Sequence, residues 1–107
     1  MLINELNADS GLRLPIIGFG AAPLGGLYGK TEGAKDLVKL ALEKGVNYFD
    51  TSPYYGNSEI VLGECLRRVP RGEYYISTKC GRNNDDTFDY SGDNIRRSVA
   101  TSLDRLH

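Results

Sequence analysis

The chain has 107 residues, with 13 Lys and Arg against 14 Asp and Glu, so its net charge is -1. A nearly neutral chain gives no electrostatic reason to expect a nucleic-acid or anionic-membrane partner. Its 40% hydrophobic and 25% charged residues are typical of a globular protein. No apolar run approaches the roughly 18 residues of a membrane helix, and the polar, acidic start is not a secretory signal. We therefore expect a cytoplasmic protein.

The sequence predicts no metal site. His107 is the single histidine, and the two cysteines, Cys65 and Cys80, lack the close spacing of zinc ligands. We expect both cysteines to be small buried apolar residues, and nothing in the sequence favours a disulfide between them.

The first half of the chain predicts a hairpin, a strand and a helix. Residues 2–6 and 12–14 form the two hairpin strands around the turn-rich residues 7–11. A strand is expected over 16–19, followed by a glycine-rich loop over 20–29. Helical spacing then begins near Thr31 and should end at Gly45, which is suited to a left-handed cap. The apolar face of this helix comprises Ala34, Leu37, Val38 and Ala41.

The second half alternates in the same way. Strands are expected over 46–49 and 74–78, and the loop 50–56 follows the first of them. Asn57 or Ser58 can cap one helix, which ends before residues 70–72, and Ser91 can cap another after the polar loop 83–90. The apolar face of the first helix comprises Leu62, Cys65, Leu66 and Val69, and that of the second comprises Ile95, Val99, Leu103 and Leu106.

This order of strands and helices predicts an α/β fold with parallel strands joined by right-handed crossovers. Three such units and a hairpin do not close a barrel. At least one strand edge would stay open unless another segment or chain covers it, so we expect the chain to be prone to self-association through that edge.

Three side chains at predicted strand ends could act together. Asp50 and Lys79 follow neighbouring strands, which lie about 4.8 Å apart in a parallel sheet, so an ion pair is within reach. Tyr55 lies five residues beyond Asp50, in a loop that can return over the sheet. A cation beside a phenol favours the phenolate, so Lys79 could make Tyr55 a general acid near neutral pH while Asp50 holds Lys79 in place. Spacing alone does not choose between Tyr54 and Tyr55.

A second feature is the run Gly18–Pro23, which begins like a dinucleotide-binding fingerprint. Proline stands where the third glycine should be, and a loop follows, so the Rossmann interpretation is disfavoured. The small residues Gly20, Ala21 and Ala22 could still let a flat cofactor approach the backbone, although a simple tight connection explains them equally well.

Taken together, these motifs resemble the N-terminal part of an aldo-keto reductase. The matching segments keep the family's order and spacing across nearly the whole chain. Within the family, the sequence is similar to the branch of L-galactose dehydrogenase and aldose 1-dehydrogenases. The matching segments are Ile17–Gly20, Gly45–Gly56, Ser58-Glu59 with Leu62-Gly63, and Ser77–Lys79.

The resemblance implies a role for each site residue. Tyr55, rather than Tyr54, would be the catalytic acid and base, Lys79 the cation that makes it more acidic, and Asp50 the partner of Lys79. Asp50 and the segment from Gly20 to Ala22, including Ala21, would lie beside a nicotinamide cofactor, NADP or NAD. The implied substrate is a sugar lactol, alcohol or carbonyl.

The same resemblance implies that residues 1–107 are an incomplete, truncated domain. The family fold is a TIM (β/α)8 barrel of about 250 residues, of which this chain would supply the hairpin and the first three βα units. The family's catalytic histidine follows a fourth strand, and His107 does not match it. Most cofactor contacts lie in the second half of the barrel. We therefore expect the 107 residues to be inactive alone; the alternative is an inactive product that acts, if at all, by associating with other chains.

Overall fold

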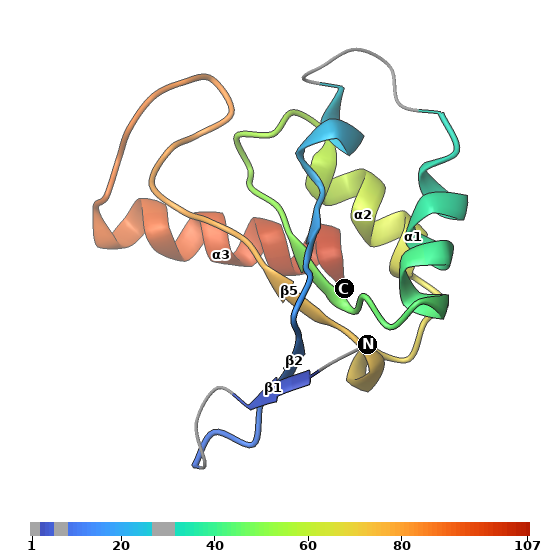
Figure 1. Cartoon of the computed structure of the whole chain (residues 1–107). Coiled ribbons are helices and arrows are strands. Elements are labelled where there is room, and N and C mark those ends of the chain that lie inside the picture. The colour runs from blue at the N-terminus through green and yellow to red at the C-terminus, as the bar shows by residue number, and fades with distance from the viewer. Residues whose placement is uncertain (1–2, 6–8, 27–31) are drawn as a thin grey trace.

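A computed structural model describes residues 3–5, 9–26 and 32–107. Two short strands, β1 (Ile3–Glu5) and β2 (Arg13–Pro15), pair antiparallel, with Asn4 opposite Leu14. The predicted hairpin is thus confirmed, although its residues 6–8 lie outside the described part. Figure 1 shows the hairpin projecting from the body of the molecule, at the end from which the next strand starts.

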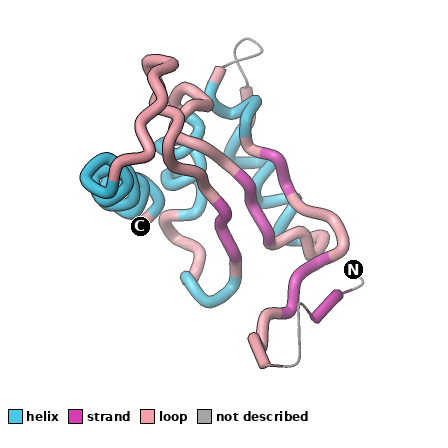
Figure 2. Tube along the Cα trace, turned by 90° about the vertical axis from the view of Figure 1, so that its left-hand side faces the viewer, coloured by secondary structure: helices cyan, strands magenta, loops and turns pink. Residues whose placement is uncertain are grey.

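A parallel three-stranded sheet forms the centre of the fold. It has the order β3-β4-β5, with β3 at Phe19–Gly20, β4 at Tyr48–Asp50 and β5 at Tyr75–Ser77. Phe49 lies opposite both Phe19 and Ile76, so the register aligns the carboxyl ends of all three strands. Figure 2 shows these strands side by side.

Three α-helices alternate with the strands: α1 (Ala34–Glu43), α2 (Ser58–Leu66) and α3 (Gly92–Leu106). Two short 3-10 helices, η1 (Ala22–Gly25) and η2 (Arg71–Glu73), lie in the connections. In Figure 2 the helices gather on one side of the strands. The core lies between the two layers and comprises Ala21, Leu24, Val38, Phe49, Leu62, Leu66, Tyr74 and Leu106. Among the described residues, no helix is long and apolar enough to cross a membrane.

The helix ends follow the local sequence rules in two places and depart from them in one. Gly45 has a φ of 84° and closes α1, and the Ser91 side chain accepts the Asn94 N–H at the start of α3, both as predicted. Asn57 occupies the position before α2, but its side chain makes no capping hydrogen bond. The predicted start near Thr31 lies outside the described residues, and α1 itself begins at Ala34.

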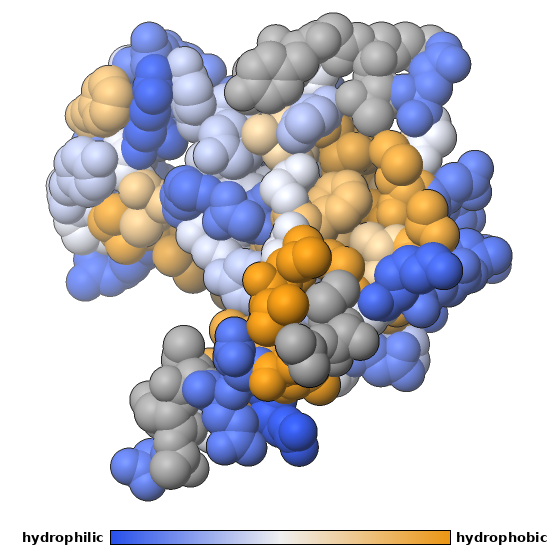
Figure 3. Space-filling model, in the orientation of Figure 1, coloured by the Kyte–Doolittle hydropathy of each residue, from blue (hydrophilic) through white to orange (hydrophobic). Residues whose placement is uncertain are grey.

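Two sequence predictions about the first half of the chain were wrong. The strand expected over 16–19 is confined to Phe19–Gly20, because only these residues pair with β4, and Ile16 and Ile17 stay about half exposed. Figure 3 shows the resulting hydrophobic surface near the junction of hairpin and sheet. Leu37 is 45% exposed on α1.

The largest departure is in α3. Val99 and Leu103 are 47% and 67% exposed, whereas Ser102 and Leu106 of the same helix are buried. The buried face of α3 therefore includes Leu106, as predicted, but not Val99 or Leu103. Cys80 is exposed and only Cys65 is partly buried; both thiols are free.

Candidate active site

The carboxyl ends of β4 and β5 bring Lys79 and Asp50 together. Asp50 ends β4, and Lys79 follows β5 by two residues. Because the strands are neighbours in register, the Lys79 Nζ lies 2.8 Å from the Asp50 Oδ2 and donates a second hydrogen bond, 2.9 Å long, to the Thr51 carbonyl oxygen. The ion pair expected from the sequence is present, and a backbone carbonyl fixes the same ammonium.

The surroundings of Lys79 favour its charged form. Partial burial opposes the charge, but the hydrogen bond and the charge of Asp50, with a smaller contribution from Tyr55, outweigh it and raise the pKa of Lys79. An ammonium held in this way keeps its charge throughout the neutral range. A fixed positive charge is what a neighbouring phenol needs to become more acidic.

Tyr55 is the tyrosine that lies beside this ammonium. The Lys79 Nζ is 5.1 Å from the centre of the Tyr55 ring. The backbone of Tyr55 is held on both sides, since its N–H donates to the Ser52 carbonyl over 3.1 Å and its carbonyl accepts the Ser58 N–H over 3.0 Å. The residue thus stands in a turn tied directly to the start of α2.

Tyr54 faces a different cation. The Arg82 guanidinium lies 3.5 Å above the centre of the Tyr54 ring, and its Nε and Nη2 donate to the Asp86 Oδ1 over 2.9 and 2.7 Å. The structure therefore separates the two tyrosines that sequence spacing could not distinguish: Tyr55 belongs with Lys79 and Tyr54 with Arg82. Nothing in the sequence indicated the Arg82 stack, because it joins two loops that follow different strands.

Two glycines position the turn that carries Tyr55. A Cβ on Gly25 would overlap the Tyr55 carbonyl oxygen, and a Cβ on Gly56 would stand 2.5 Å from the Gly25 carbonyl oxygen. Gly56 also has a φ of 54°, in the region that favours glycine. The η1 segment after β3 and the turn after β4 are therefore in direct backbone contact.

The three small residues proposed to lie beside a cofactor differ in access. Gly20 is exposed, and a Cβ placed on it would meet nothing within 4 Å, so a flat ligand can approach the backbone there. Ala22 is half-buried. The Ala21 side chain is fully buried in the core, and its N–H donates to the Asp50 carbonyl over 2.8 Å. The open surface at Gly20 fits a cofactor, whereas Ala21 instead joins β3 to β4.

The start of α2 adds a polar network that sequence reasoning missed. Ser58 and Glu59 are fully buried, although each looked like an ordinary residue of a helix start. The Ser58 hydroxyl bonds the Ala21 carbonyl and the Thr51 hydroxyl, both over 2.7 Å. The available signal was the pair Ser58-Glu59 directly after the loop 50–56. The burial of these two side chains depends, however, on partners that are distant in the sequence.

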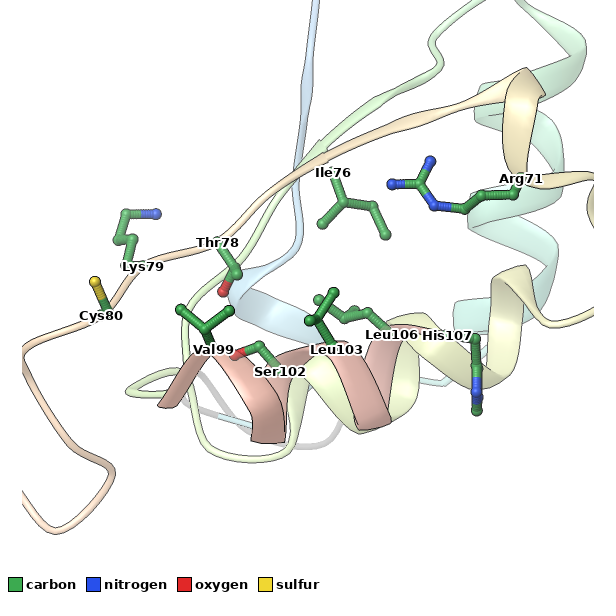
Figure 4. A pocket seen from close by; sticks show the side chains of 10 residues that line it. All are labelled: Arg71, Ile76, Thr78, Lys79, Cys80, Val99, Ser102, Leu103, Leu106 and His107. Atoms are coloured by element: carbon green, nitrogen blue, oxygen red, sulfur yellow. The ribbon is translucent and has the colours of Figure 1, made fainter. Parts of the chain in front are cut away.

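A cavity of about 220 Å³ lies between β5 and α3. Figure 4 shows Ile76 and Thr78 pointing toward α3, while Lys79 leaves the chain on the opposite side. Lys79 lines this cavity, whereas Asp50 and Tyr55 do not. The cavity therefore adjoins the strand-end cluster through Lys79, and Val99 and Leu103 of α3 form part of its apolar wall.

The fold and the candidate site define a class of protein in which parallel strands alternate with helices and Asp50, Tyr55 and Lys79 gather at the strand ends. The comparisons with known proteins identify the family. The model of the aldo/keto reductase family matches residues 16–107. The chain belongs to the aldo/keto reductase family.

The curated relatives include several sugar dehydrogenases. The chain is 44% identical to L-galactose dehydrogenase from Arabidopsis thaliana over 95% of its own length and 34% of that protein. It is 46% identical to D-arabinose 1-dehydrogenase from Saccharomyces cerevisiae over 68% of its length and 23% of that protein. The chain thus spans about a third or less of these relatives. These dehydrogenases, like other aldo-keto reductases, use nicotinamide cofactors.

Solved structures share the fold. A protein from Pseudomonas aeruginosa, assigned as an aldo-keto reductase, matches with a TM-score of 0.86 and 38% identity, over 98% of this chain and 41% of that one. A thermostable aldo-keto reductase crystallised with the inhibitor epalrestat matches with a TM-score of 0.74 and 26% identity, over 99% of this chain and 39% of that one. The described fold is thus a mixed α/β unit of a TIM-barrel family.

Proposed function

We propose that this chain supplies the proton-transfer residues of an NAD- or NADP-dependent dehydrogenase that acts on a sugar lactol, alcohol or carbonyl, in the manner of L-galactose dehydrogenase. The observation that carries the proposal is the cluster at the strand ends. Lys79 is bonded to Asp50 over 2.8 Å and lies 5.1 Å from the Tyr55 ring centre. The similarity to sugar dehydrogenases supports the substrate class.

In this proposal, Tyr55 moves the proton. During oxidation its phenolate accepts the proton of the substrate hydroxyl, and during reduction its phenol donates a proton to the carbonyl oxygen. Lys79 stabilises the phenolate, and Asp50 with the Thr51 carbonyl keeps Lys79 in place. A nicotinamide cofactor, when bound near Gly20, Ala22 and Asp50, would supply or accept the hydride.

We also propose that residues 1–107 form the first part of a barrel and do not catalyse hydride transfer alone. The experiment compares the 107-residue chain with a chimera in which residues 16–107 replace the matching segment of the Arabidopsis thaliana enzyme. We expect no turnover of L-galactose with NAD or NADP for the chain, and turnover for the chimera. Turnover by the isolated chain would refute its incompleteness, and a folded but inactive chimera would refute the assigned chemistry.

A second candidate function is association with other chains through the free edge of β5. The Tyr75 N–H donates to the Asn47 carbonyl and the Ser77 carbonyl accepts the Thr51 N–H, at the two ends of β4. Among the described residues, no strand pairs with the other edge of β5. The exposed Val99 and Leu103 lie on the helix beside it. Size-exclusion chromatography and limited proteolysis of the 107-residue chain test this: oligomers support it, and a compact, protease-resistant monomer contradicts it.

A further inference from the structure

Two adjacent residues at the start of α2 contact the ends of all three parallel strands. The Ser58 hydroxyl donates to the Ala21 carbonyl, just after β3. Since a hydroxyl has one proton, the Thr51 hydroxyl, just after β4, is the donor in the bond between Thr51 and Ser58. The Glu59 Oε2 accepts from the Thr78 hydroxyl, just after β5, over 2.9 Å. One helix start thus links the three segments from which the candidate active site is built.

Glu59 is the unusual member of this pair because it is a carboxylate with 1% of its surface exposed. Burying an unpaired charge is costly, so a buried carboxylate requires partners for its oxygens. Its second oxygen, Oε1, accepts from the Arg105 Nη1 of α3 over 3.0 Å. Arg105 can approach because Gly63, one turn after Glu59 on α2, has no side chain. A Cβ at this position would overlap the Arg105 carbonyl oxygen. The carboxylate is therefore held between α3 and the end of β5.

Thr78 carries this restraint to Lys79, its neighbour in the chain. Figure 4 shows the two side chains leaving the backbone on opposite sides, Thr78 toward α3 and Lys79 away from it. Fixing the Thr78 hydroxyl on the helix side therefore fixes the direction in which Lys79 points on the other side. The chain here lies beyond the last β5 residue, Ser77, and the ladder of the sheet no longer restrains it.

We propose that Glu59, acting through Thr78, is a positioning residue that holds Lys79 beside Tyr55. This proposal rests on the proposed function, in which the Lys79 ammonium stabilises the Tyr55 phenolate. Loss of the Glu59–Thr78 bond lets Lys79 move from Tyr55, and proton transfer then loses the fixed positive charge beside the phenol. A purely structural role would instead lower the amount of folded protein equally at every pH.

The test uses Thr78→Val and Thr78→Ser in the chimera that carries residues 16–107. Valine keeps the volume of threonine without the hydroxyl, and serine keeps the hydroxyl without the methyl group. Two properties are measured: the pH dependence of kcat/KM for sugar oxidation, and the ¹³Cε resonance of Lys79, which is assigned by its loss in Lys79→Met. Glu59→Met, which removes both acceptor oxygens, is the second variant, and Glu64→Gln, which alters an exposed carboxylate of the same helix, is the control.

We expect Thr78→Val to move the rising limb of the oxidation profile upward by about half a pH unit or more and to displace the Lys79 resonance. Thr78→Ser and Glu64→Gln should match the unsubstituted chimera, and Glu59→Met should change both properties as Thr78→Val does. An unchanged Lys79 resonance in Thr78→Val, or an equal displacement in Thr78→Ser, overturns the proposal. If the unsubstituted chimera folds but oxidises no sugar, the proposed function fails, and the Lys79 resonance alone then decides about Glu59.

Discussion

The end of β5 and its outer edge differ in how completely their groups are paired. At the end of β5, Lys79 has two oxygen partners, and the Thr78 hydroxyl donates to the buried Glu59, which Arg105 of α3 also contacts. Along the outer edge, no described strand pairs with β5, and Leu103 is 67% exposed beside a cavity. The comparison teaches that polar contacts with α2 and α3 hold the candidate site, and that the uncovered edge takes no part in them.

The largest expected effect concerns the tyrosine pair. In the chimera that carries residues 16–107, Tyr55→Phe should lower kcat by about 10²–10⁴-fold, because it removes the group that transfers the proton. Tyr54→Phe is the matched control, since the neighbouring ring stacks on Arg82 and lies away from Lys79. Steady-state kinetics with NAD or NADP and a sugar measure both. Comparable losses in the two variants would contradict the separation of the tyrosines.

Gly25 tests the backbone contact beneath Tyr55. Gly25→Ala should destabilise the fold by about 3 kcal/mol, the upper part of the usual range for overpacking, because the new Cβ meets the rigid Tyr55 carbonyl. Denaturant unfolding measures the change. Gly72→Ala is the control, because a Cβ there has open space, and it should stay within about 0.5 kcal/mol of wild type. Equal stability of both variants would show that η1 does not restrain the turn.

Leu106 and Leu103 allow the buried and the exposed face of α3 to be compared directly. Leu106→Ala should cost about 2 kcal/mol, because this side chain is 7% exposed and packs in the core. Leu103→Ala should change the free energy of unfolding by less than about 0.5 kcal/mol. Both are measured by denaturant unfolding at one protein concentration. A large loss for Leu103→Ala would mean that its face is covered in solution.

The smallest effect is the pH dependence due to Lys79. Because its folded-state pKa is raised above the ordinary value of 10.5, the stabilisation from its ion pair is complete below that value and is lost as the pH rises through the folded-state pKa. The free energy of unfolding, followed from pH 8 to 12, should therefore fall less steeply at the alkaline end in Lys79→Met. Lys39→Met, which removes an exposed helix lysine, should keep the wild-type slope.

The sequence predicted what depends on near neighbours in the chain or on the alignment of adjacent parallel strands. Gly45 and Ser91 marked helix ends because capping involves residues within a few positions, and the ion pair of Asp50 with Lys79 followed from the alignment of adjacent parallel strands. The exposure of Leu103 was not predictable, since helical spacing shows which residues share a face and not what covers that face.

Distant partners explain the rest of what the sequence did not predict. Glu59 is buried because Arg105, 46 residues later, reaches it across a close helix contact. Spacing alone does not distinguish Tyr54 from Tyr55, because Arg82 stacks on Tyr54 from a separate loop. Such pairs have no local signature, and they become visible only when the helices and loops are placed in space.

The direct backbone contact of Gly25 with the turn at Tyr55 and Gly56 also sets a spacing within the molecule. The open backbone at Gly20 and the side chain of Tyr55 belong to two segments that touch there without a side chain between them. The distance between these segments is therefore set by the backbone alone, and no exchange of one side chain for a smaller one could bring them closer.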